Sequence, residues 1–453
     1  MNTRKHSRPT KPKAPKAPKA TAPVSSRSNQ EPAAPPRKRQ SEPALDAPGA
    51  RVSRRAADRL REGHVWVYAS DIESTDWTAG GEVPSLVRVA DHRGLLLGTA
   101  LYSPSSQISL RLVVRESIGP EAWLGLLGRR LRDAVARRKG MLTGDTNACR
   151  LCFSEADELP GLVVDVYGGL VILQLLVRGL DSAEVRQACV RALRDELAPE
   201  SILERPDPRM RELEGLSAPD LAPLWSANGK APLTRTAFRM NGLEFQYDAN
   251  SGQKTGAFLD QRMNYVAAEE WARRLNTTGR VLDVCTYQGG FALHLARLCR
   301  QVTGIDTSRA SLEVAESNLA ANRERLSAEV DWVEADAFAL LRDWSDAREQ
   351  FDVIVLDPPA FAKSRRAVEG ALRGYKELNL RALKMLRPGG LLITCSCSHH
   401  VALADLENLV ASAAADAHRR VRLLERRGAA PDHPVILNIP ETEYLKCLVL
   451  EVG

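Results

Sequence analysis

The chain has 453 residues, of which 44% are hydrophobic and 26% are charged, and its formal net charge is +6. These values indicate a globular protein of about two or three domains and exclude fibrous, disulfide-knotted and wholly disordered classes. Its apolar runs are far shorter than the roughly 20 residues of a membrane-spanning helix, and no apolar signal core follows the basic N-terminus. We therefore expect a cytoplasmic protein without membrane contact, whose eight cysteines are thiols.

Residues 1–50 differ in composition from the rest of the chain. They contain 11 Lys or Arg residues and 3 acidic residues, a net charge of +8, and 10 of the 26 prolines. Because large apolar residues are almost absent, we predict a disordered, basic, proline-rich tail. The tail is either a solvated extension without a fixed partner or a cationic arm that contacts nucleic-acid phosphates.

Two smaller domains are predicted before residue 241. Alternating apolar and polar residues predict short strands over 65–68, 85–89, 94–101 and 108–112, and hence a small β-rich domain over residues 51–120. Residues 121–240 have a helical period from Glu121 to Lys139, strands over 162–167 and 169–177, and a second helical period from Ser182 to Leu197. They predict a small α+β middle domain.

Residues 241–453 alternate between strand and helix patterns after a hairpin-like stretch at 243–247. Strands are predicted over 281–285, 302–305, 330–334, 353–356 and 390–394, with helices from 290 and over 308–322, 338–344 and 372–386. This alternation predicts an α/β fold with a parallel, doubly wound sheet, in which ligands bind at the carboxyl ends of the strands.

The ends of three predicted strands carry acidic residues suited to a nucleoside. The loop from Asp283 to Gly290 includes Tyr287 and the paired glycines 289 and 290, which let a ligand approach the backbone, although it is not G-x-G-x-x-G. Asp306 is placed to bind ribose hydroxyls, and Asp336 to accept from an adenine amino group. Each acid could instead cap the following helix. Since Gly289 and Gly290 make no pyrophosphate cradle, the sequence favours S-adenosylmethionine over NAD.

The ends of the fourth and fifth strands supply candidate catalytic groups. Asp357 faces the cofactor crevice at its strand end and is therefore also a candidate cofactor ligand. It precedes two prolines that fix an extended turn, which is frequent in nucleic-acid methyltransferases; the alternative is a rigid turn with an apolar plug. Cys397 falls in the loop after the fifth strand, where a thiol can be accessible, whereas Cys395 within the strand is expected to be structural. The pairs Cys149/Cys152 and His399/His400 lack further ligands at metal spacing, so no metal is expected.

Several stretches together resemble a known family, the bacterial S-adenosylmethionine-dependent methyltransferases that modify carbon 5 of cytosine in large-subunit (23S) ribosomal RNA. The resemblance covers about residues 51–453, and its matching stretches are 61–68 (REGHVWVY), 155–167 (EADELPGLVVDVY), 252–262 (GQKTGAFLDQR), 357–359 (DPP) and 396–398 (SCS). The chain departs from the family at Cys285, where an aromatic residue is usual, and at Gln288, where threonine is common.

The resemblance implies a PUA-like RNA-binding domain, a middle domain and a Rossmann-like class I methyltransferase domain over 241–453. It also implies S-adenosylmethionine as cofactor, ribosomal RNA as partner, and a segment from Gln253 to Arg262, with Gln253 and Lys254 as candidate ligands, that helps to enclose the cofactor. The oligomeric state is left open, a homodimer included.

Carbon 5 of a pyrimidine is a poor nucleophile, so its methylation requires a thiolate to add to carbon 6. Cys397 is the candidate nucleophile, and Asp357 would orient the base or stabilise its activated form. The target base must lie outside the helical stack. Two alternatives stay open: an N-methyltransferase that acts on an exocyclic amino group of adenine or guanine and does not need Cys397, or a non-catalytic RNA-binding ribosome assembly factor with a vestigial cofactor pocket.

Overall fold

The computed structural model describes residues 49–453 except 78–82, 218–222, 230, 251–255 and 363. The predicted tail over 1–48 and the candidate cofactor residues Gln253 and Lys254 lie outside these residues. No helix in the described part of the chain is long and apolar enough to cross a membrane.

The N-terminal sheet has six strands in the order β2-β6-β5-β4-β1-β3. Its strands are β1 (Gly49–Val52), β2 (Trp66–Tyr68), β3 (Ile72–Thr75), β4 (Leu86–Asp91), β5 (Leu96–Tyr102) and β6 (Ile108–Val114). Ser53 caps helix α1 (Arg54–Arg61) by accepting from the Ala56 N–H. The assignment of Gly49 and Ala50 to the tail is wrong, because β1 pairs with β4 and Ala50 is buried.

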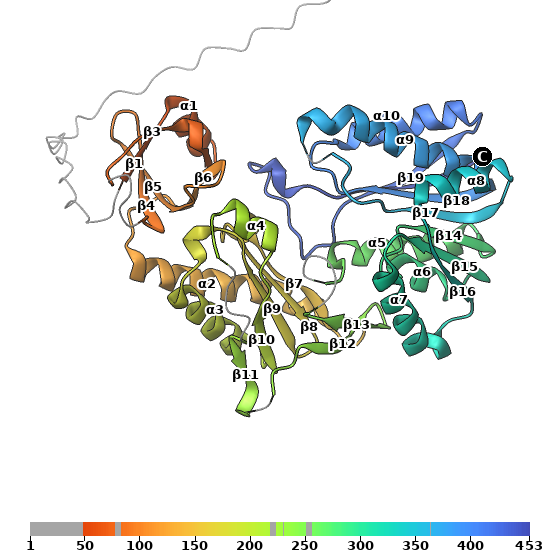
Figure 1. The fold of residues 1–453 in the computed structure, drawn as a ribbon, viewed down its shortest axis with the longest axis horizontal. Helices are drawn as coiled ribbons and strands as arrows, with labels where there is room; N and C mark the ends of the chain where they lie inside the picture. Colours follow the sequence, from red (N-terminus) through yellow and green to blue (C-terminus); the bar gives the residue numbers. More distant parts are fainter. Residues whose placement is uncertain (1–48, 78–82, 218–222, 230, 251–255, 363) are drawn as a thin grey trace, which may run out of the picture. The chain divides into compact units, whose positions relative to one another are not determined.

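The middle sheet has five strands in the order β11-β10-β9-β8-β7 (Figure 1). These are β7 (Ala148–Phe153), β8 (Leu162–Tyr167), β9 (Leu170–Leu175), β10 (Ser201–Glu204) and β11 (Trp225–Ser226). Helices α2 (Pro120–Arg138) and α3 (Ala183–Glu196) pack against each other and begin and end within one or two residues of the predicted bounds. A third helix, α4 (Pro208–Leu213), follows β10. Cys149 and Cys152 are buried in β7, where burial raises the pKa of both thiols.

The C-terminal sheet has seven strands in the order β16-β15-β14-β17-β18-β20-β19. The strands are β14 (Arg280–Val284), β15 (Gln301–Asp306), β16 (Glu329–Glu334), β17 (Phe351–Leu356), β18 (Leu386–Ser396), β19 (Val421–Arg427) and β20 (Lys446–Val452). The helices are α5 (Arg262–Arg274), α6 (Gly290–Leu295), α7 (Arg309–Asn322), α8 (Ala337–Asp346), α9 (Val368–Met385) and α10 (Leu403–Asp416). The predicted parallel, doubly wound arrangement is present in β14 to β18, and the sheet also contains β20, which runs antiparallel to both β18 and β19.

A hairpin links the middle and C-terminal sheets through a shared core. It consists of β12 (Arg235–Met240) and β13 (Leu243–Asp248), and its turn contains the predicted domain boundary at residue 241. Phe238 and Phe245 of the hairpin belong to one buried cluster with Tyr167 of the middle sheet and Phe291 of α6. The Tyr167 and Tyr247 rings stack at 4.2 Å between centroids. The hairpin therefore packs into both domains at once.

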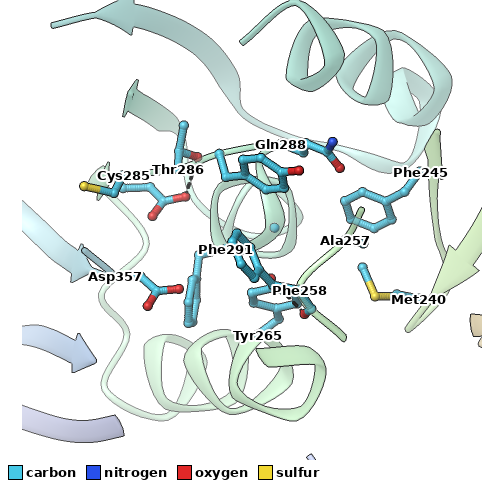
Figure 2. Close-up of a pocket in the computed structure, with 13 residues that line it drawn as sticks. Met240, Phe245, Ala257, Phe258, Tyr265, Cys285, Thr286, Gln288, Phe291 and Asp357 are labelled. Atoms are coloured by element: carbon cyan, nitrogen blue, oxygen red, sulfur yellow. Dashed lines mark hydrogen bonds between the residues drawn. The ribbon is translucent and has the colours of Figure 1, made fainter. Parts of the chain in front are cut away.

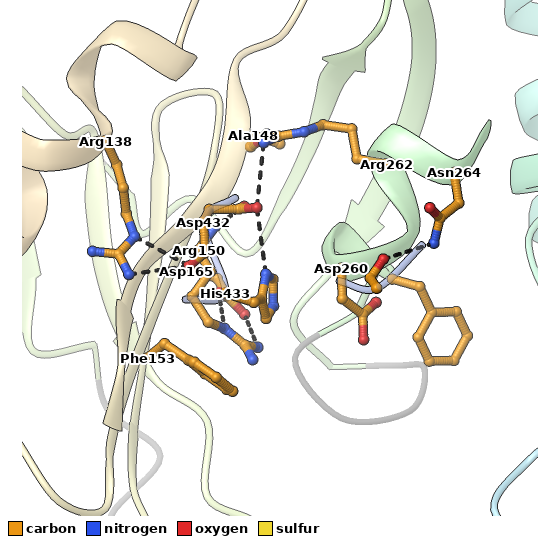
Figure 3. A network of polar contacts seen from close by, with 12 residues as sticks. Arg138, Ala148, Arg150, Phe153, Asp165, Asp260, Arg262, Asn264, Asp432 and His433 are labelled. Atoms are coloured by element: carbon orange, nitrogen blue, oxygen red, sulfur yellow. Dashed lines mark hydrogen bonds and ion pairs between the residues drawn. The ribbon is translucent and has the colours of Figure 1, made fainter. Parts of the chain in front are cut away.

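A buried ionic network adds polar contacts across the same region, centred on Asp432 in the β19–β20 connection (Figure 3). The Asp432 carboxylate accepts from the Arg150 N–H of β7 at 2.9 Å and pairs with Arg262 of α5 at 3.3 Å. Arg138 donates to the Asp432 carbonyl, and its guanidinium also binds Asp157 at 2.7 Å. These charges are buried and mutually paired, so removing one partner leaves others uncompensated.

Candidate active site

The loop after β14 has an unusual backbone. Cys285 and Tyr287 have φ angles of 61° and 53°, in the left-handed region that non-glycine residues rarely adopt, and Gly289 has a φ of 84°. Such conformations cost free energy and concentrate at functional sites. At Gly289 and Gly290 an added Cβ would meet the rings of Trp332 at 2.9 Å and Tyr265 at 2.5 Å. Packing against these rings by itself therefore requires both glycines.

Asp283, near the end of β14, is deeply buried, with 1% of its surface exposed. Its Oδ2 accepts hydrogen bonds from the Thr286 hydroxyl at 2.6 Å and the Ala292 N–H at 3.0 Å. Its Oδ1 is buried and has no hydrogen-bond partner among the described residues. Burial raises the pKa of Asp283 to about 7, in spite of those two hydrogen bonds.

Asp306 and Asp336 end β15 and follow β16, as predicted, and both make local hydrogen bonds. Asp306 accepts from the Tyr287 N–H and the Ser308 N–H, each at 2.9 Å, so it holds the β14 loop in place. Asp336 is the N-cap of α8, and its Oδ1 accepts from the Ala339 N–H. The capping alternative is therefore realised at Asp336. A carboxylate offers about four lone-pair sites, so both residues retain capacity for a ligand.

The Cys285 thiol interacts electrostatically with acidic residues from four strand ends. Burial raises the pKa of this thiol strongly, and the charges of Asp306, Asp357, Asp283 and Asp336 raise it further. Residues from four strand ends thus produce a concentrated negative field at one edge of the sheet. Such a field favours a cationic ligand and keeps Cys285 protonated.

Asp357 is held by Gln261, a residue that the sequence analysis did not single out. Gln261 is 2% exposed and donates from Nε2 to the Asp357 Oδ2 at 2.9 Å. Its own amide is oriented by Asn264, which donates to the Gln261 Oε1 at 2.6 Å and accepts from Arg427 at 2.8 Å. The chain of contacts fixes which way the Gln261 amide points. Gln261 belongs to the 252–262 stretch that resembles the family, and this is its sequence signal. Gln253 and Lys254 were the residues of that stretch chosen as candidates.

A cavity lies between the β14 loop, the hairpin and the start of α5 (Figure 2). Polar groups from Asp283, Thr286, Gln288 and Asp357 line it, together with the Cys285 thiol and with apolar or aromatic side chains, namely Met240, Phe245, Ala257, Phe258, Tyr265, Tyr287 and Phe291. The Phe258 and Tyr287 rings lie 4.7 Å apart, and the Tyr287 hydroxyl donates to the Gly256 carbonyl at 2.7 Å. The segment after residue 255 thus closes against the loop.

The two neighbouring cysteines differ as expected in position. Cys395 is fully buried in β18 opposite Cys447, and its pKa is raised by interaction with Cys447 and by burial. Cys397 follows the last residue of β18 and is partly exposed, with its Sγ 4.0 Å from the Pro358 carbonyl oxygen. Cys397 therefore lies beside the Asp357-Pro358-Pro359 turn. The ring centroids of His399 and Tyr444 lie 5.7 Å apart.

Comparisons with known proteins identify the fold and the family. The sequence matches the family of S-adenosylmethionine-dependent methyltransferases over residues 151–449 and the PUA-like domain family over residues 50–115. It is 36% identical over 398 residues to ribosomal RNA large subunit methyltransferase I of Citrobacter koseri, covering 85% of this chain and 95% of that protein. The Cronobacter sakazakii protein of the same name is 38% identical over 394 residues, with the same coverage.

The chain belongs to the ribosomal RNA large subunit methyltransferase I family. It is an S-adenosylmethionine-dependent enzyme, and the resemblance inferred from its motifs is confirmed. Among solved structures, a putative S-adenosylmethionine-dependent methyltransferase from Streptococcus mutans has the same fold, with a TM-score of 0.72 at 19% identity. It covers 88% of this chain and 99% of that one. A putative methyltransferase complexed with SAH gives a TM-score of 0.71 at the same identity and coverage.

The residues of the methyltransferase site fit S-adenosylmethionine. This cofactor carries a positive sulfonium and a positive amino group, which suit the acidic residues at the four strand ends. The buried Asp283 Oδ1 lacks a partner within the described ranges, and such an orphaned acceptor is normally satisfied when a donor binds.

Proposed function

We propose that this enzyme methylates carbon 5 of a cytosine in large-subunit ribosomal RNA through a covalent Cys397 adduct. The observation that carries the proposal is the position of Cys397, partly exposed beside the Asp357 turn at the carboxyl edge of the sheet. The substrate class is supported by the names of relatives that are 36% and 38% identical over nearly their whole length.

The cofactor would be held by carboxylates from three strand ends. Asp283 would accept from its amino group through Oδ1, Asp306 would bind the ribose hydroxyls, and Asp336 would accept from the adenine amino group with the oxygen that does not cap α8. Tyr287, Gly289 and Gly290 would shape the loop, and Gln253 and Lys254 would help to enclose the cofactor. When bound, the cofactor supplies a methyl group on its sulfonium.

Cys397 and Asp357 would act on the target base. The Cys397 thiolate adds to carbon 6, which makes carbon 5 nucleophilic; after methylation a base removes the carbon 5 proton, the C–S bond breaks and the thiolate returns. Asp357, oriented by Gln261, would hold the base or stabilise its activated form. The PUA-like domain would bind RNA, and the target base would have to lie outside a helical stack.

A Cys397→Ala variant tests the covalent route. We expect turnover on large-subunit ribosomal RNA to be abolished while S-adenosylmethionine binding, measured by calorimetry, stays near normal. Cys395→Ala is the matched control, because that thiol is buried in β18 and its loss should cost about 1 kcal/mol of stability without abolishing turnover.

RNA that carries 5-fluorocytosine at the target provides a direct readout. Fluorine blocks the final proton abstraction, so the wild-type enzyme should form a trapped adduct at Cys397 that mass spectrometry of peptides can locate. Full methylation by Cys397→Ala would contradict the covalent route and favour transfer to an exocyclic amino group. Absence of any methylation by the wild-type enzyme would favour a non-catalytic assembly factor.

A further inference from the structure

Lys446 is a buried lysine next to the Cys397 loop, and nothing in the site described so far uses it. It is the first residue of β20 and lies opposite Ser396, the last residue of β18, in the antiparallel ladder. Cys397 follows Ser396 directly, so the lysine lies next to the turn that carries the thiol. It is 6% exposed, which is rare for a lysine without a carboxylate partner.

The Lys446 ammonium binds only backbone carbonyls in the described part of the chain. Its Nζ donates to the Ser398 carbonyl at 2.7 Å and to the Tyr444 carbonyl at 2.7 Å. An ammonium has three N–H donors, so one remains for another acceptor. A buried charge that is bonded only to neutral groups is costly, and a negative partner would offset that cost.

Among the described charged and titratable groups that interact with Lys446, Cys397 is the candidate for that partner. Burial lowers the pKa of Lys446, and interaction with the Cys397 sulfur is the largest influence that raises it. Glu443 and Asp405 act in the same direction but more weakly, and the Asp405 carboxylate already accepts from the Ala402 N–H at 2.9 Å.

Two tyrosines among the described residues also interact with Cys397. Tyr375 of α9 shares a hydrogen bond of 3.0 Å with the Ser398 hydroxyl, and the Tyr444 hydroxyl donates to Asp260 at 2.5 Å. The pKa of each is raised, chiefly by burial and in smaller part by the charge of Cys397. Both tyrosines are therefore neutral and offer the sulfur no charge, whereas the Lys446 ammonium interacts with it as a cation.

We propose that Lys446 is a positioning residue whose ammonium stabilises the thiolate form of Cys397. The inference rests on the proposed function, because the covalent mechanism is what requires Cys397 to be a thiolate. The positive charge of the Lys446 ammonium would act at two steps of the reaction. It favours the thiolate before addition to carbon 6, and it stabilises the thiolate again when the C–S bond breaks and both electrons of that bond return to sulfur. No proton is transferred to or from Lys446 in either step.

A purely structural role for Lys446 predicts a different result. If its two hydrogen bonds only pin residues 398 and 444, removal of the charge would change stability or the placement of the loop. It would leave the pH at which Cys397 ionises unaltered. The reactivity of the thiol toward a small alkylating agent distinguishes the two roles, because it depends on the thiolate fraction and needs no RNA.

The test measures the rate of Cys397 alkylation by iodoacetamide from pH 5.5 to 10, with the modified peptide identified by mass spectrometry so that Cys285 does not interfere. The wild-type midpoint should lie below the value of about 8.5 for a free thiol. Lys446→Met should move the midpoint upward and slow alkylation at pH 7 tenfold or more, as expected for loss of a neighbouring opposite charge. Lys446→Arg should retain a low midpoint.

Control measurements separate the proposal from misfolding and from the proposed function. Lys376→Met, at a half-exposed lysine of α9 that pairs with Asp416, should leave the profile unchanged. A wild-type midpoint at or above that of a free thiol overturns the proposal, even if Lys446→Met does not fold. The proposal is also overturned if Lys446→Met folds and has the same midpoint as the wild type. If the midpoint shifts but Cys397→Ala still methylates RNA, the Lys446 inference stands and the covalent mechanism fails.

Discussion

Replacing Asp283 with asparagine should stabilise the cofactor-free enzyme while weakening the binding of S-adenosylmethionine. The carboxyl is 1% exposed, and burial raises its pKa from 3.8 to about 7. A shift of that size corresponds to about 4 kcal/mol of unfavourable free energy for the ionised form. Asparagine has nearly the same shape and can still accept from Thr286 and Ala292 through its amide oxygen.

The sign of the pH dependence follows from the direction of this shift. The folded pKa lies above the unfolded pKa, so the stability that the protonated group provides is present below about pH 4 and is lost as the pH rises to about 7. The advantage of the Asp283→Asn variant in free energy of unfolding should therefore grow between pH 4 and pH 7 and stay constant above. Most of it, up to about 3 kcal/mol, should appear between pH 5 and pH 8.

Thermal unfolding of the cofactor-free wild type and variant at pH 5 and pH 8 measures the difference in their stability, and calorimetry measures cofactor binding. Binding to the wild type should strengthen as the pH rises toward 7 and release a proton near pH 6, because the ionised carboxylate is the form that pairs with the amino group. The variant should bind tenfold or more weakly at pH 8 and show no such proton release. Asp331→Asn, on the exposed face of β16, is the matched control. Equal stability and equal cofactor affinity in wild type and variant at pH 8 would refute the reasoning.

Three further predictions follow from other parts of the chain. Asp306→Ala should bind S-adenosylmethionine clearly more weakly by calorimetry, since the carboxylate both holds the β14 loop and is the proposed ribose ligand; unchanged affinity would remove it from the site. Asp432→Ala should destabilise the protein by about 3 kcal/mol or more in urea unfolding, because Arg262 would be left buried without its partner; a loss below about 1 kcal/mol would mean that solvent compensates the charge. Deletion of residues 1–48 removes a net charge of +8 and should lower RNA affinity mainly at low salt; an unaltered salt dependence would exclude RNA contact by the tail.

Most of the local structure, and the choice of candidate site residues, could be predicted from the sequence alone. Strand and helix periods predicted β8 with its bounds, and α2, α3 and α7 within one or two residues, because their apolar faces are regular and each is punctuated by polar or capping residues. Asp283, Asp306, Asp336 and Asp357 could be selected because parallel strands place their carboxyl ends at one edge. The motifs around Cys397 and the 252–262 stretch were specific enough to indicate the family.

The tertiary structure decided what depends on contacts between distant segments. The antiparallel direction of β20, the packing of the β12–β13 hairpin into both domains and the pairing of β1 with β4 arise from long-range register, which no local period encodes. The same holds for Gln261 beside Asp357 and for Lys446 next to Cys397, which are brought there from 96 and 49 residues away in the sequence. Burial then sets the charge state of Asp283 and Lys446, because the free energy of an ion depends on the surroundings that folding creates.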